Sequence, residues 1–330
     1  METLIDVHDL HVTFSTKFGQ VNAVKGVSFH VNEGEIVAVV GESGSGKSVM
    51  SMSLLRLIAK NGRIQSGQIM YKGNDLTKSS EQEMQKIRGA EIAMIFQDPM
   101  TCLNPVFTIE NQMDEVLSFH RKEMGRSQRV DVMIQMLDKV GMQNPEQRLR
   151  QYPHELSGGL RQRAMIAMSL LCQPKLLIAD EPTTALDVTI QAQIMALIKE
   201  LCVEMKTSVI LITHNLGVVA GMAERVMVMY GGEIVESAPI NEIFYRAVHP
   251  YTQGLLNALP KLHMGKAALK SIPGSAPDLL LDVNCCMFYY RCEYAMDCCM
   301  EAAPEIYEVG EEHLVKCWRC HPDFSEEVQA

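Results

Sequence analysis

Residues 41–48 read Gly-Glu-Ser-Gly-Ser-Gly-Lys-Ser, which satisfies the phosphate-binding pattern G-x-x-x-x-G-K-[ST]. An apolar run from Ile36 to Val40 precedes this loop and has the length and β-branched composition of a strand buried on both faces. The apolar spacing that begins at Val49 predicts a helix. Strand, glycine-rich loop and helix thus follow one another in the order that a phosphate-binding loop requires.

The residues of this loop are the predicted ATP ligands. Glycines permit a tight turn whose backbone N–H groups surround the phosphates. Lys47 is expected to reach the β- and γ-phosphates, and the Ser48 hydroxyl to coordinate Mg²⁺. A plain glycine- and serine-rich connector is the alternative interpretation. The predicted ligands are Gly41, Glu42, Ser43, Gly44, Ser45, Gly46, Lys47 and Ser48.

The rest of the chain up to about residue 255 alternates between strand and helix patterns. Such alternation predicts an α/β fold with a layered core. About 80 residues of helical periodicity follow the strand expected at 91–96, which predicts a helical subdomain at about 98–172. Further buried strands are expected at 91–96, 175–180 and 208–213, a helix at 188–205, and a hairpin at 225–236 that turns at Gly231-Gly232.

Two carboxylates, Asp180 and Glu181, stand at the end of a predicted buried strand. Ligands of open α/β sheets bind at the carboxyl ends of strands. One carboxylate can hold Mg²⁺ through water, and the other can orient the attacking water and accept its proton. Acidic residues are also common in ordinary loops, so the pair alone does not decide between the two interpretations.

The segment Leu156-Ser-Gly-Gly-Leu160 begins an amphipathic helix. Free backbone N–H groups and the positive end of the helix dipole at such a start favour an anion. The alternative is a plain serine N-cap.

Composition limits the class of protein. The 330 residues carry 30 Lys and Arg against 40 Asp and Glu, and the resulting net charge of −10 opposes a main role in coating nucleic acid. No apolar run approaches the roughly 20 residues that cross a bilayer. The first residues lack an export signal, so we expect the chain in the cytoplasm and a membrane role only through partners.

The joint order of these elements resembles the nucleotide-binding subunit of ATP-binding-cassette (ABC) transporters over about residues 4–255. The resemblance implies a P-loop NTPase fold of the ABC ATPase type, with a RecA-like core, an antiparallel β subdomain and a helical subdomain. It also implies that two such subunits enclose two ATP molecules, so that catalysis belongs to the dimer. The implied roles are Phe18 stacking on adenine, Gln97 contacting Mg²⁺ and the attacking water, Glu181 as the catalytic base, His214 as the γ-phosphate switch, Ser48 and Asp180 at Mg²⁺, and Ser157, Gly158, Gly159 and Asp187 contacting ATP on the partner subunit.

Leu160 departs from the commonest family pattern, which has Gln at this position. Because Ser157 and the backbone of Gly158 and Gly159 would make most of the γ-phosphate contact, we expect the change to alter the rate without removing activity.

Three segments resemble the oligopeptide/dipeptide importer subfamily: 96–105, 183–193 and His249-Pro-Tyr-Thr252. This resemblance implies import of di- or oligopeptides, with a heterodimer of two ATPase subunits beneath two permeases at the cytoplasmic face of the membrane. An external binding protein would deliver the substrate, and no nucleic acid would take part. A nickel, metal-chelate or antimicrobial-peptide transporter is the nearest alternative. A soluble ABC ATPase of DNA repair or translation is a further one.

Residues 256–330 form a predicted C-terminal extension that holds seven of the ten cysteines in its last 46 residues. Such clustering without an export signal points to a metal site rather than to disulfides. The pattern of Cys286, Cys292, Cys299 and Cys317 resembles that of the same subfamily, which implies a [4Fe–4S] cluster; tetrahedral Zn²⁺ is the alternative. The other cysteines are surplus, although Cys317-Trp-Arg-Cys320 with His321 also fits a zinc knuckle.

Overall fold

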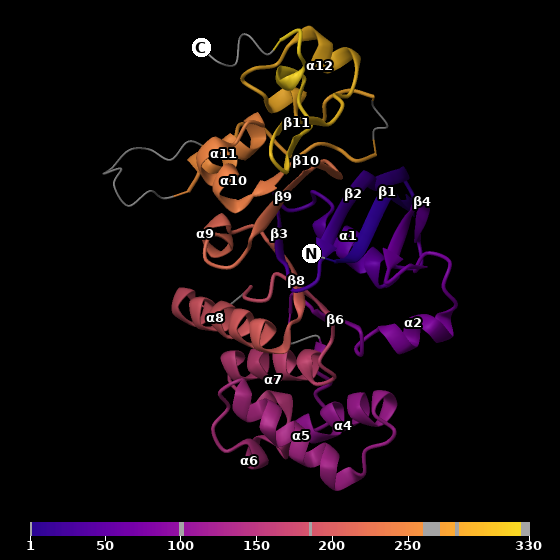
Figure 1. Ribbon diagram of the computed structural model, residues 1–330, viewed down its shortest axis with the longest axis vertical. Coiled ribbons are helices and arrows are strands. Elements are labelled where there is room, and N and C mark those ends of the chain that lie inside the picture. The colour runs from indigo at the N-terminus through magenta and orange to yellow at the C-terminus, as the bar shows by residue number, and fades with distance from the viewer. Residues whose placement is uncertain (1, 99–101, 185–186, 260–270, 281–283, 325–330) are drawn as a thin grey trace. The chain divides into compact units, whose positions relative to one another are not determined.

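The computed structural model of the chain describes residues 2–98, 102–184, 187–259, 271–280 and 284–324 (Figure 1). The chain forms two compact units. The first unit consists of residues 1–3, 31–36 and 78–212, and the second consists of residues 4–30, 37–77 and 213–330.

A parallel sheet forms the centre of the first unit. Its strands are β6 (Ile92–Ile95), β7 (Leu176–Asp180) and β8 (Ser208–Thr213), in the order β8, β7, β6. Every residue of the three strands is buried, which explains why their sequences are apolar without alternation. Ile95 pairs with Ala179, so β6 and β7 end at the same edge of the sheet.

Helices make up most of the remaining first unit. Helix α7 packs on β6, and the Ser169 hydroxyl donates to the Met94 carbonyl oxygen at 3.3 Å. Helices α4, α5 and α6 pack against one another, and α4 and α5 also contact α7 (Figure 1). The long helices keep an apolar face for these contacts, as their sequence periodicity predicts. Among the described residues of the unit, the helices are α2 (Glu81–Ile87), α4 (Ile109–His120), α5 (Arg126–Lys139), α6 (Pro145–Leu149), α7 (Gly158–Leu170) and α8 (Val188–Met205), with a 3₁₀ turn at Pro153–Glu155.

The second unit contains an antiparallel sheet of four strands near the N-terminus. The order is β2, β1, β4, β5, and β4 pairs antiparallel with both β1 and β5. Burial alternates in β2 from Val27 to Val31 but not throughout β1 and β2, since the neighbours Leu4 and Ile5, Val12 and Thr13, and Ala23 and Val24 are all buried. The bounds are β1 (Thr3–Thr16), β2 (Gly19–Asn32), β4 (Gly62–Tyr71) and β5 (Asn74–Asp75).

A second set of strands in this unit carries the phosphate-binding loop. Strand β3 (Ile36–Val40) pairs parallel with β9 (Arg225–Tyr230), and β9 pairs antiparallel with β10 (Glu233–Pro239). Gly231 and Gly232 join β9 to β10 with φ angles of 58° and 88°. Two positive φ angles in a two-residue hairpin favour glycine at both positions, which confirms the predicted turn.

The C-terminal region adds two short strands to this sheet. Strand β12 (His313–Val315) pairs antiparallel with β10, and β11 (Tyr307–Gly310) pairs with β12. The buried Glu236 carboxylate accepts a hydrogen bond from His313 at 2.8 Å and from the Val248 N–H at 2.7 Å, which ties the region to β10. In the part of this unit that the structure describes, the helices are α1 (Lys47–Leu54), α9 (Leu216–Val219), α10 (Ile240–Arg246), α11 (Pro250–Asn257) and α12 (Asp297–Glu301), with 3₁₀ turns at Tyr289–Arg291 and Trp318–Cys320.

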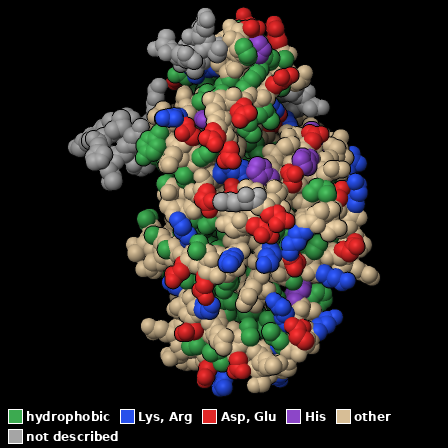
Figure 2. Space-filling view, viewed as in Figure 1, with side chains coloured by type: hydrophobic (Ala, Val, Ile, Leu, Met, Phe, Trp, Pro, Cys, Tyr) green, Lys and Arg blue, Asp and Glu red, His purple; other side chains and the backbone are tan. Residues whose placement is uncertain are grey.

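The predicted domain boundary near residue 255 falls inside α11. Among the described residues, no helix has both the length and the apolar character needed to span a membrane. On the face that Figure 2 shows, Lys and Arg side chains are interspersed with Asp and Glu side chains.

Candidate nucleotide-binding site

The phosphate-binding loop of the second unit connects β3 to α1. Gly41, Gly44 and Gly46 have φ angles of 154°, 80° and 102°. A Cβ at Gly46 would overlap the backbone carbonyl oxygen of Ala23, so this position requires glycine for space as well as for conformation. The loop therefore has the tight backbone course that its sequence predicts.

Lys47 is held inside the curve of this loop. Its Nζ donates to the carbonyl oxygens of Gly41 and Glu42, both at 2.8 Å, and lies 3.3 Å from Ser45 Oγ. The residue is 5% exposed. Because α1 begins at Lys47, the N–H groups of its first turn have no carbonyl partner within the helix and are suited to phosphate oxygens.

Residues from elsewhere in the second unit also hold the backbone of the loop. The Glu42 N–H donates to the Tyr251 hydroxyl at 2.8 Å, and the Gly232 N–H donates to the Ser45 carbonyl oxygen at 3.0 Å. In the sequence Tyr251 stands only within the subfamily motif 249–252, which does not indicate this contact. Both contacts come from residues far from the loop in sequence, so spacing alone could not reveal them.

Phe18 and His214 also belong to the second unit. Phe18 lies in the turn between β1 and β2, and it is 88% exposed. An aromatic ring exposed to this extent has a free face for stacking on a base. His214 follows β8 directly and is exposed as well. These positions agree with the predicted roles, which stay predictions.

The first unit brings two of the predicted catalytic residues together. Because β6 and β7 end at the same edge, Gln97 and Glu181 follow strand ends that lie side by side. Gln97 Nε2 donates to Glu181 Oε2 at 2.9 Å. The Thr184 hydroxyl donates to the same oxygen at 2.9 Å, a contact that was not predicted from the sequence. Glu181 has a φ of 46°, which turns the backbone sharply after Asp180.

Asp180 ends β7 and is 3% exposed. Its carboxylate, the Gln97 amide oxygen and the Ser48 hydroxyl are oxygen donors of the kind that Mg²⁺ prefers. The donor types therefore fit the predicted magnesium ligands.

Two helix starts in the first unit carry the residues predicted to contact ATP on a partner subunit. Ser157 is the N-cap of α7, but its side chain makes no capping hydrogen bond, and both it and Gly158 are exposed. Asp187 is the N-cap of α8 and accepts a hydrogen bond from the Ile190 N–H at 3.0 Å. The Ser157 hydroxyl is therefore not consumed by its own helix, whereas the Asp187 carboxylate also has a structural role.

The four predicted metal ligands lie in the C-terminal region of the second unit. Burial raises the pKa of the Cys286 and Cys317 thiols to about 12, and neighbouring thiols of the same group add to the rise. The Cys286 N–H donates to the Cys299 carbonyl oxygen at 2.9 Å. All ten cysteines are free thiols. In the part of the chain that the structure describes, no group of three or more His, Cys, Asp or Glu side chains is arranged to hold a metal ion, so Cys286, Cys292, Cys299 and Cys317 do not form a ready ligand set.

Comparison with known proteins identifies the family. The family model described as "ABC transporter" matches residues 24–184, and the model described as "Oligopeptide/dipeptide transporter, C-terminal region" matches residues 235–299. The chain is 50% identical over 322 residues to the oligopeptide transport ATP-binding protein OppD of Bacillus subtilis, covering 97% of this chain and 90% of OppD. The chain belongs to the ABC transporter family. It is also 48% identical over 318 residues to OppD of Escherichia coli, covering 96% and 94% of the two chains.

Solved structures of this ABC family share the fold. The dimeric post-hydrolysis structure of the ATP-binding cassette MJ0796 with ADP and Pi gives a TM-score of 0.64 at 28% identity, covering 72% of this chain and 98% of MJ0796. The cbiO1 protein of Clostridium perfringens, part of the ABC transporter complex cbiONQ, also gives 0.64, at 25% identity, covering 74% and 92% of the two chains. The chain therefore has the P-loop cassette fold of ABC ATPases.

Proposed function

We propose that this chain is the ATP-hydrolysing subunit of a multi-subunit ABC importer that carries di- and oligopeptides across the cytoplasmic membrane. The hydrogen-bonded pair of Gln97 and Glu181 at the end of β7 carries the ATPase part of the proposal, because it holds a carboxylate at the edge of the sheet where ligands of α/β folds bind. The match of residues 235–299 to the oligopeptide/dipeptide transporter C-terminal region supports the peptide part.

The proposed reaction uses residues of both units. The loop 41–48 binds the phosphates of ATP, and Phe18 stacks on the adenine. Glu181 accepts the proton of the attacking water, and His214 contacts the γ-phosphate. Ser48, Gln97 and Asp180 would hold Mg²⁺, which supplies charge neutralisation for the transferring phosphoryl group when bound.

We further propose that the active form is a dimer of two different ATPase subunits. Ser157, Gly158, Gly159 and Asp187 would contact ATP bound to the partner subunit. The uncommitted Ser157 hydroxyl and the exposed start of α7 support this, since a site that completes another subunit must be accessible. Two permeases would anchor the dimer at the cytoplasmic face of the membrane, and an external binding protein would deliver peptide.

The metal site is a separate part of the proposal. Cys286, Cys292, Cys299 and Cys317 are proposed to bind a [4Fe–4S] cluster, with Zn²⁺ as the alternative. Thiols of raised pKa must lose protons to become ligands, and metal binding supplies the free energy for that loss. Because the described residues form no ready metal site, binding also requires these side chains to converge.

Transport-coupled ATP hydrolysis tests the function. The chain is assembled in lipid vesicles with its second ATPase, its permeases and the binding protein, and the rate of ATP hydrolysis is measured with peptides of two to five residues or with nickel complexes. We expect peptides to stimulate hydrolysis and the Glu181→Gln complex to stay inactive. Stimulation by nickel complexes alone would contradict peptide import. Copurification with nucleic acid and without permeases would contradict a transport role.

Elemental analysis and visible absorption of protein purified without air test the metal. A cluster predicts a brown protein with about four irons per chain, which loses colour on Cys286→Ser or Cys292→Ser. Cys285→Ser and Cys298→Ser are the matched controls and should leave the spectrum unchanged. A colourless protein with one zinc per chain would reject the cluster, and loss of that zinc in Cys320→Ser would favour the knuckle.

A further inference from the structure

Arg291 of the C-terminal region contacts the phosphate-binding loop directly. Its guanidinium donates two hydrogen bonds to the Glu42 carboxylate, from Nη1 to Oε2 at 2.7 Å and from Nη2 to Oε1 at 3.0 Å. Glu42 is the second residue of the loop and lies 249 positions away in the sequence. The Arg291 side chain is 7% exposed and that of Glu42 is 29% exposed. Two parallel bonds of this kind fix the orientation of both side chains as well as holding them together.

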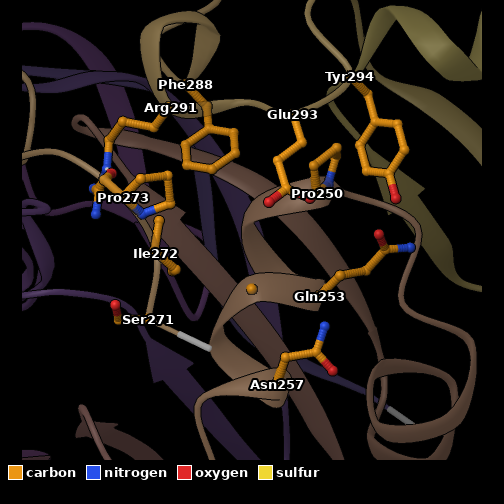
Figure 3. Close-up of a pocket in the computed structure, with 11 residues that line it drawn as sticks. Pro250, Gln253, Asn257, Ser271, Ile272, Pro273, Phe288, Arg291, Glu293 and Tyr294 are labelled. Atoms are coloured by element: carbon orange, nitrogen blue, oxygen red, sulfur yellow. The ribbon is translucent and has the colours of Figure 1, made fainter. Parts of the chain in front are cut away.

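Other groups of the second unit hold the guanidinium in place. Nε donates to the Pro273 carbonyl oxygen at 2.7 Å, and Figure 3 shows the Arg291 side chain beside Pro273. Nη1 also donates to the Tyr230 hydroxyl at 3.3 Å. The rings of Tyr230 and Phe288 have their centroids 5.7 Å and 6.0 Å from the guanidinium carbon. Arg291 is therefore a fixed positive charge with little freedom to leave Glu42.

The position of Glu42 explains why such a charge is needed. In this chain the loop proposed to bind the ATP phosphates carries a carboxylate, that of Glu42, at its second position, and like charges at short distance repel. Arg291 neutralises this carboxylate, while the Tyr251 hydroxyl holds the Glu42 N–H. Without the guanidinium, a partly buried carboxylate would lose its charged partner, which is costly inside a protein. It would be free to turn toward the bound phosphates.

We propose that Arg291 is a positioning residue for the phosphate-binding loop, so that the cysteine-bearing C-terminal region is required for full ATP affinity. This inference rests on the proposed function, since it assumes that the loop binds ATP. Arg291 lies between Cys286 and Cys292 in the sequence, so the folding of that region and the affinity for ATP are linked. The link is local, because Arg291, Glu42 and their partners all belong to the second unit.

Binding of Mg·ATP and of AMP to the full chain, measured by calorimetry well below the unfolding temperature, tests the proposal. We expect Arg291→Met to weaken ATP binding by about tenfold, equivalent to about 1.4 kcal/mol. AMP, which lacks the β- and γ-phosphates, should bind nearly as before. Adding Glu42→Gln to Arg291→Met should recover most of the lost affinity, because the unpaired carboxylate is then absent. If Arg291→Met does not fold, Arg291→Lys takes its place. We then expect ATP affinity to fall by about threefold, because a single ammonium replaces the two parallel hydrogen bonds of the guanidinium.

Lys316→Met is the matched control. Lys316 Nζ donates to Glu233 at 2.7 Å, so this pair also joins the C-terminal region to the sheet but does not involve the loop. The control should bind ATP as the wild type does. Unchanged ATP affinity in the folded Arg291 variants would overturn the positioning role, and so would an equal loss for AMP or for the control. Failure of the wild-type chain to bind ATP would instead overturn the proposed function.

Discussion

The Glu181→Gln substitution separates the chemical step from folding and from nucleotide binding. Gln97 and Thr184 both donate to the same oxygen, Oε2 of Glu181, so the carbonyl oxygen of the new glutamine can accept both hydrogen bonds. Bonds to a charged acceptor contribute about 1.5–3 kcal/mol and neutral bonds about 0.5–1.5 kcal/mol. The two bonds together thus weaken by about 2 kcal/mol, and by less where solvent reaches them.

The effect on catalysis has a different cause, the loss of the proton acceptor. An amide cannot accept the proton of the attacking water, so turnover should fall by at least about a hundredfold, or about 2.7 kcal/mol in the barrier. The assay compares ATP turnover and ATP affinity of the assembled transporter with those of the variant. Glu204→Gln, at an exposed carboxylate that pairs with Lys139, is the matched control and should leave both unchanged. Wild-type turnover in Glu181→Gln would refute the assignment of Glu181 as the base.

Three further predictions follow from the second unit. Gly46→Ala places a Cβ against the Ala23 carbonyl oxygen, so calorimetry should show ATP binding reduced by at least about tenfold in a chain that still folds. Burial lowers the pKa of His249 from 6.5 to about 4. Between these pH values the imidazole is protonated in the unfolded chain but not in the folded one, so the free energy of unfolding should fall by about 3 kcal/mol as the pH drops from 6.5 to 4. Thermal unfolding of His249→Asn, which keeps a side-chain acceptor for the Tyr251 N–H, should depend less on pH there. Phe18→Ala removes a stacking face and should weaken ATP more than inorganic triphosphate in competition binding; equal losses for the two ligands would reject stacking.

Much of the cassette could be predicted from the sequence because its elements are long or uniformly apolar. The helix expected at 188–205 is α8, and the hairpin at Gly231-Gly232 has the expected turn. Strands β11 and β12 were not predicted, since four and three residues are too few to show periodicity.

The phosphate-binding loop could be predicted from the sequence, whereas the residues that hold it in place could not. Residues 41–48 are contiguous, and their chemistry is visible in the order of residue types. Arg291 and Tyr251 reach Glu42 only through tertiary packing, and no pattern in the sequence connects positions so far apart. Thr184 lies only three residues after Glu181, but a threonine at this spacing does not by itself predict a hydrogen bond to the carboxylate.

The pairing of β12 with β10 bears on aggregation. A strand with an unpaired edge presents N–H and C=O groups to any other chain, and proteins commonly cover such edges. In this protein the cover comes from β12, whose Leu314 and Val315 pair with Ser237 and Glu236. A chain shortened to residues 1–257 would keep the phosphate-binding loop but leave β10 open at that edge, with Glu236 deprived of His313. We expect such a fragment to self-associate through edge-to-edge strand addition, so the C-terminal strands also protect the cassette from other copies of itself.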